Sequence, residues 1–129
     1  MRKALRFGLL VAGGSRPVGK PLISPDGRHE AQTEISGNEA GPTRCCCVRV
    51  KFREIDTGHE MTFQTGASDY QKWAITWSPS GSLVLYSSDI GICAHDLKDG
   101  KVVERSADDA ESQIARGAYQ KKFGKKVPA

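Results

Sequence analysis

The sequence predicts a mainly β domain, in which an antiparallel meander of about six to seven short strands is followed by a C-terminal α-helix. Three observations lead to this prediction. Apolar and polar residues alternate over short runs, which is the period of a half-buried strand. Turn sequences containing Gly, Pro and Asp separate these runs. Small and apolar residues recur at helical spacing only near the C-terminus, over residues 108–123.

The clearest alternating strand occupies residues 46–53, where apolar residues at the even positions alternate with Cys47 and three basic residues. Residues 83–86 are apolar at nearly every position, so we expect both faces of that strand to be covered. Turns with Pro at the second position and Gly at the fourth precede the strands after Gly27 and Gly81. The remaining predicted strands are 28–35, 60–64, 73–77, 90–96 and 101–104.

The terminal helix is predicted from its capping chemistry as well as from its spacing. Ser106 can act as the N-cap, and Asp109 follows three residues later, as in a short capping box. Acidic residues in the first turn and lysines in the last turn suit the helix dipole. A chain of 129 residues holds one domain of ordinary size, which we place at residues 20–129.

Two stretches of the chain, residues 22–63 and 72–104, follow the same order of turn, apolar strand and second turn. The second reads Trp77-Ser78-Pro79-Ser80-Gly81, then the apolar strand, then Asp96-Leu97 shortly before Gly100. This pattern resembles the TolB-like and WD-type β-propeller repeat, in which each blade is a four-stranded antiparallel meander. Propellers close with four or more blades, and this chain has room for two. The resemblance therefore implies two blade-like repeats but not a closed propeller.

Residues 1–19 are predicted to be a signal-like or disordered leader. Basic residues come first, then the apolar run from Phe7 to Ala12, then small residues. This order resembles a bacterial lipoprotein signal, but Gly14 stands where that family has its lipidated cysteine. The resemblance implies export to the periplasm or the outer membrane, with membrane attachment only in a lipidated native form. A cytoplasmic protein with an accidental resemblance is the alternative.

The net charge of +4 comes from the two ends of the chain. Residues 20–105 carry ten basic and twelve acidic side chains, which argues against a nucleic-acid-binding face. The sequence lacks the G-x-S-x-G, S-x-x-K and H-E-x-x-H motifs of common hydrolases. We therefore expect neither an enzyme nor a bound cofactor, and we identify no catalytic residues.

Four cysteines, Cys45, Cys46, Cys47 and Cys93, allow three interpretations. A disulfide between Cys46 and Cys93 would suit an exported protein. Buried free thiols are an equally good interpretation. A thiol-based metal or redox site at residues 45–47 is a third, although no C-x-x-C spacing supports it and we predict no metal site.

The candidate partner-binding surface is the segment that contains Asp69, Tyr70, Lys72 and Trp73, since Tyr and Trp are favoured anchors at interfaces. The alternative is that Trp73 and Trp77 share one strand face and fill the core. The favoured function is a non-catalytic protein-binding module of the bacterial envelope that uses a sheet edge or loops. One version is an immunity or inhibitor protein that occludes a secreted toxin. An envelope-associated structural module with basic ends on anionic lipid is the other alternative.

Overall fold

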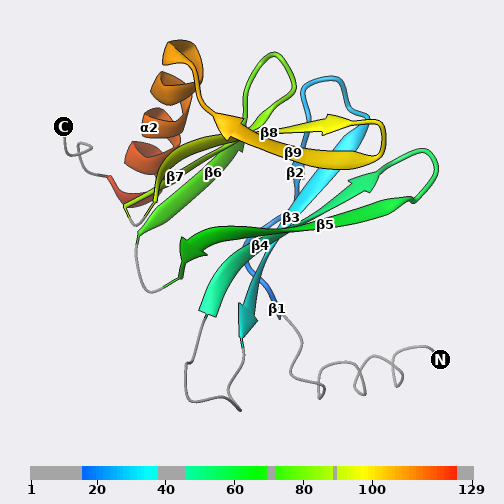
Figure 1. The fold of residues 1–129 in the computed structure, drawn as a ribbon, viewed down its shortest axis with the longest axis horizontal. Coiled ribbons are helices and arrows are strands. Elements are labelled where there is room, and N and C mark those ends of the chain that lie inside the picture. The colour runs from blue at the N-terminus through cyan, green and yellow to red at the C-terminus, as the bar shows by residue number, and fades with distance from the viewer. Residues whose placement is uncertain (1–15, 38–45, 70–71, 89, 125–129) are drawn as a thin grey trace.

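The computed structural model of the 129-residue chain describes residues 16–37, 46–69, 72–88 and 90–124. These residues form nine strands and one helix (Figure 1). In chain order the elements are β1 (Arg16–Pro17), β2 (Leu22–Ile23), β3 (His29–Gly37), β4 (Cys46–Glu54), β5 (Glu60–Ser68), β6 (Trp73–Trp77), β7 (Leu83–Ser87), β8 (Gly91–Lys98), β9 (Lys101–Ser106) and α2 (Asp109–Phe123).

The strands form two separate antiparallel sheets. The first sheet has the order β1-β3-β4-β5, with β2 also paired to β3, and the second has the order β6-β7-β8-β9. All seven longer strands, β3 to β9, lie where the sequence predicts them, and β6 has the predicted bounds. The fold is therefore mainly β with a terminal helix and no closed propeller or barrel among the described strands, as predicted. Its relation to the propeller family stays a prediction.

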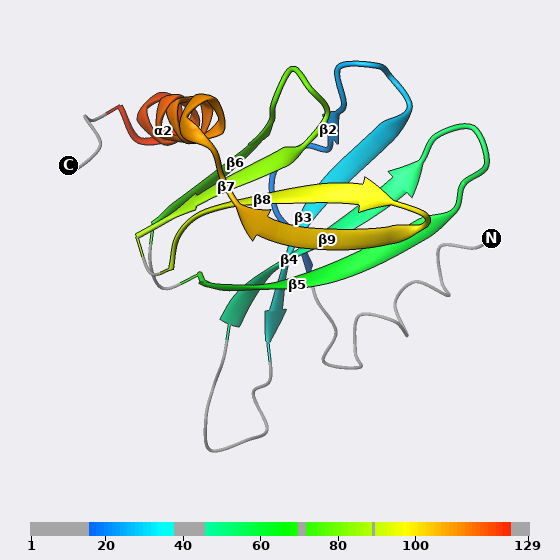
Figure 2. The same ribbon diagram turned by 45° about the horizontal axis from the view of Figure 1, so that its top comes forward.

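The molecule has three layers, with the second sheet between the first sheet and α2 (Figures 1 and 2). All five residues of β7 are buried because this strand is covered on both faces. Leu83 and Leu85 pack against the first sheet, whereas Val84 and Tyr86 pack beneath the helix. The prediction that both faces of this strand are covered is confirmed.

The helix begins at Asp109, and its N-cap is Asp108 rather than the predicted Ser106. The carboxylate of Asp108 accepts a hydrogen bond from the backbone N–H of Glu111 at 2.8 Å. In return, the Glu111 carboxylate accepts one from the backbone N–H of Asp108 at 3.0 Å. This reciprocal capping box satisfies the amide groups of Asp108 and Glu111, which have no partner within the helix.

The ordered domain begins before the predicted boundary at residue 20. Arg16 and Pro17 form β1 on the edge of β3, and the backbone N–H of Val18 donates to the carbonyl of Thr33. Two residues of the predicted leader, Arg16 and Pro17, are therefore part of the first sheet. Residues 1–15, which carry the lipoprotein-like pattern and Gly14, lie outside the described residues.

Candidate functional site

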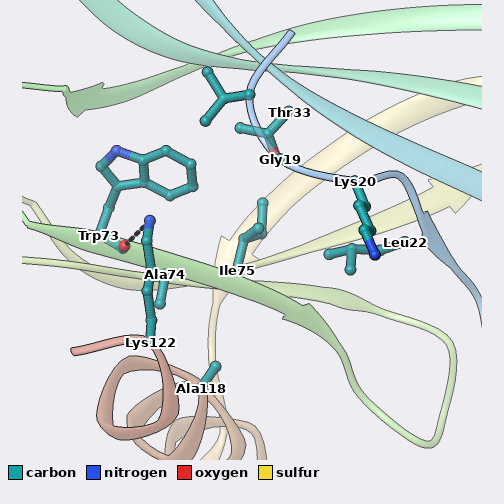
Figure 3. A pocket seen from close by; sticks show the side chains of 10 residues that line it. Gly19, Lys20, Leu22, Thr33, Trp73, Ala74, Ile75, Ala118 and Lys122 are labelled. Carbon is teal, nitrogen blue, oxygen red and sulfur yellow. Dashed lines mark hydrogen bonds between the residues drawn. The ribbon is translucent and has the colours of Figure 1, made fainter. Parts of the chain in front are cut away.

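A pocket of about 240 Å³ opens where the edges of the two sheets meet beside the helix (Figure 3). The segment between β1 and β3 forms one wall, β6 forms the floor, and the C-terminal half of α2 closes the far side. We call this the seam pocket. Its lining is mostly apolar and includes two lysines: Val18, Gly19, Lys20, Leu22, Thr33, Trp73, Ala74, Ile75, Ala118 and Lys122.

The floor of the seam pocket is the free edge of β6. In an antiparallel pair of strands, every second residue points its N–H and C=O groups toward the partner strand. The residues between them point these groups away from it. Ser88 donates to the Lys72 carbonyl and Ser78 donates to the Ser82 carbonyl, so the even-numbered residues of β6 face β7. The N–H and C=O groups of Ile75 therefore point outward, and they have no backbone partner among the described residues.

Lys122 lies at one end of this edge. Its ammonium donates a hydrogen bond to the outward-facing carbonyl of Trp73 at 2.8 Å and stands 3.6 Å from the centroid of the Trp73 ring. This position removes water from the ammonium, so desolvation lowers the pKa of Lys122, and the negative charge of Asp69 opposes that shift. Lys122 thus makes a cation–π contact with the Trp73 ring and also satisfies the Trp73 carbonyl, one of the hydrogen-bond acceptors on the edge of β6.

The predicted partner-binding residues do not form one exposed patch. Trp73 is only 6% exposed and packs in the core with Leu85, so the core interpretation holds for this residue. Its indole N–H donates to the Asp69 carboxylate at 2.9 Å. Lys72 is exposed, with its ammonium 5.4 Å from the centroid of the Phe123 ring, and Tyr70 lies outside the described residues.

The structure brings Asp69 and Trp73 together with Lys122, a residue that the sequence analysis did not select. The helix supplies Lys122 from a run of similar lysines, and nothing in the local pattern distinguishes it from Lys121. Only the packing of α2 on β6 determines which lysine reaches the pocket. Trp77, the other tryptophan, is half-buried, and its indole N–H donates to the Leu22 carbonyl at 3.0 Å.

The possible disulfide between Cys46 and Cys93 is not formed, because Cys93 has a free thiol, as the second interpretation predicted for this cysteine. Leu85 on β7 is paired with Cys93 on β8 in the sheet register. It is Leu85 that packs with Val48 of the first sheet. Cys47 is disulfide-bonded. Burial raises the pKa of Cys93, with a smaller contribution from Glu104, so its thiol stays protonated near neutral pH and is a weak nucleophile.

Two further charged clusters have structural roles. Arg105 donates to both oxygens of Glu111, at 2.8 and 2.7 Å, and to Asp96 at 2.6 Å, which ties β9 to α2 and β8. His95 is 1% exposed, and its ring nitrogens lie 3.1 Å from the Leu83 carbonyl and from the Glu104 carboxylate. Among the described residues, no group of three His, Cys, Asp or Glu side chains could hold a metal ion. Cys45 lies outside those residues.

Comparisons with protein families, curated proteins and solved structures found no match to this chain. Within the described ranges, the helix is too short and too polar to cross a membrane.

Proposed function

We propose that the protein is a non-catalytic protein-binding module that receives an extended segment of another protein along the free edge of β6. The observation that carries this proposal is the pair of outward-facing backbone groups on Ile75, which lie beside a mostly apolar pocket. Extended segments bind sheet edges through such groups, and neighbouring pockets supply the selectivity.

The ends of the free edge limit the length of the bound segment. At the start of β6, Lys122 already occupies the Trp73 carbonyl. At the other end, the Trp77 indole is hydrogen-bonded to Leu22, which brings β2 against the edge. A bound segment would therefore pair at Ile75 and place its neighbouring side chains in the seam pocket. A short contact of this kind favours weak, selective recognition over a large permanent interface.

The test is selection of binding peptides from a displayed library of short random peptides, with two variants as controls. Ile75→Pro removes the outward N–H without removing a bond to β7, because proline is tolerated on the open side of an edge strand. Ile75→Ala loses similar packing but keeps the N–H. We expect selected peptides to bind the wild type and Ile75→Ala and to lose binding to Ile75→Pro. Near-ultraviolet circular dichroism checks that both variants fold.

Amide hydrogen exchange on the wild-type protein gives a second measurement that does not depend on the proline variant. A peptide paired with the edge should slow exchange at Ile75 and leave Ala74 unchanged, since the Ala74 amide already faces β7. A library with no enriched sequence contradicts the proposal. Selected peptides that bind Ile75→Pro equally well, or that leave exchange at Ile75 unchanged, contradict it too.

The bacterial-envelope location and the role as an immunity or inhibitor protein are finer versions of this proposal. They rest on the sequence of residues 1–15 and on analogy with small envelope proteins. In that version the bound segment belongs to a secreted toxin, and the module acts by occluding it.

A further inference from the structure

We propose that the seam pocket selects an acidic side chain on the bound segment, with Lys122 as the group that recognises it and Lys20 adding positive charge on the opposite wall. This inference rests on the proposed function, because it names the chemistry of the segment that the β6 edge would receive. The ligand is thus an extended peptide with an Asp or Glu at the residue that enters the pocket.

The charges of the pocket favour a carboxylate. Lys20 and Lys122 line it from different layers of the fold, one from the segment between β1 and β3 and the other from α2 (Figure 3). Among the described residues that line the pocket, none is acidic. The nearby Asp69 is exposed and does not line the pocket, and its carboxylate accepts a hydrogen bond from the indole N–H of Trp73.

The Lys122 ammonium has donors left for a ligand. An ammonium carries three N–H donors, and among the described residues Trp73 supplies the one acceptor within hydrogen-bonding distance. Although Lys122 is exposed as a residue, its ammonium lies against the Trp73 ring, which shields one side of it from water and strengthens an ion pair formed there. Desolvation also lowers the pKa of Lys122, and the negative charge of Asp69 opposes this shift.

The strand geometry delivers a side chain to this position. Successive side chains of an added strand point alternately to its two faces. One face of the second sheet carries the helix with Ala118 and Lys122, and the other faces the first sheet. A segment paired at Ile75 would therefore direct one side chain toward Lys122, while its neighbours face the segment that contains Lys20.

The test uses synthetic hexapeptides with acetylated and amidated ends, built from Val and Thr, that differ only in a central Asp or Asn. Affinities are measured by titration calorimetry on the wild type, Lys122→Met and Lys121→Met. Lys121 is the matched control, because it is the adjacent exposed lysine and does not line the pocket. We expect the Asp peptide to bind about three- to tenfold more tightly than the Asn peptide. This preference should disappear in Lys122→Met and persist in Lys121→Met.

The outcomes separate this inference from the proposed function. If both peptides bind the wild type equally, or if Lys121→Met loses the preference as fully as Lys122→Met does, selection of an acidic side chain is wrong while edge binding stands. A third peptide has the Asn sequence with a free C-terminal carboxylate in place of the amide. If this peptide binds as tightly as the Asp peptide, the pocket recognises the end of a chain and the inference is also wrong. If neither peptide binds the wild type, both ideas fail.

Discussion

Replacing Leu85 with alanine tests whether the second sheet is packed against the first sheet. Leu85 is fully buried in the contact between the two sheets, among Ile35, Val48, Ala67 and Trp73. The substitution removes three carbon groups, whose transfer free energy is about 2.4 kcal/mol. A residual cavity of roughly 40 Å³ would add about 1 kcal/mol. We therefore expect the free energy of unfolding to fall by about 3.5 kcal/mol.

Urea denaturation followed by tryptophan fluorescence measures this loss. With a denaturant slope of about 2 kcal/mol per molar, typical of small domains, the midpoint should move down by about 1.5–2 M. Val103→Ala is the control, since Val103 is 43% exposed on the edge strand β9 and should cost less than about 1 kcal/mol. If Leu85→Ala costs no more than this control, the sheets are not packed together at Leu85 and the three-layer arrangement is wrong.

Two further predictions concern the attachment of the helix. Asp108→Ala should lower the free energy of unfolding by about 1 kcal/mol, whereas Ser106→Ala should change it by less than about 0.5 kcal/mol. Urea denaturation measures both values. A larger loss in Ser106→Ala than in Asp108→Ala would place the cap at Ser106. Hydrogen bonds from Arg105 lower the pKa values of Asp96 and Glu111, so the unfolded chain binds their protons more readily. Stability should therefore fall as the pH drops below about 5, and this decline should be shallower in Arg105→Gln. Thermal melts at several pH values measure the decline. An equally steep decline in Arg105→Gln would show that Arg105 does not cause the lowered pKa values.

The strands could be predicted because their signals are local. Alternation in β4 and the proline-glycine turns before β3 and β7 each lie within a few residues of the element they define. The continuous apolar run at residues 83–86 also indicated the middle layer, since a strand covered on both faces has no polar side. The helix was placed within one residue of its start, and only its cap was misassigned.

The seam pocket could not be predicted because its parts are distant in sequence. Lys20 and Lys122 come from opposite ends of the chain, and they line one pocket only when α2 packs on β6. The outward direction of the Ile75 backbone depends on strand register, which no composition pattern reveals. Trp73 was selected for its residue type, and a tryptophan in an alternating strand suits the core and an interface equally well.

The order of the layers has a consequence for how the chain is made. The two strands that carry Val84 and Ala94 are synthesised before α2, whose Ala115 and Tyr119 cover them. Until residues 109–123 leave the ribosome, this apolar face has no cover, although both sheets are already complete in sequence. A chain that stopped before residue 109 would thus keep its paired strands but expose this apolar face, and we expect it to aggregate with its copies.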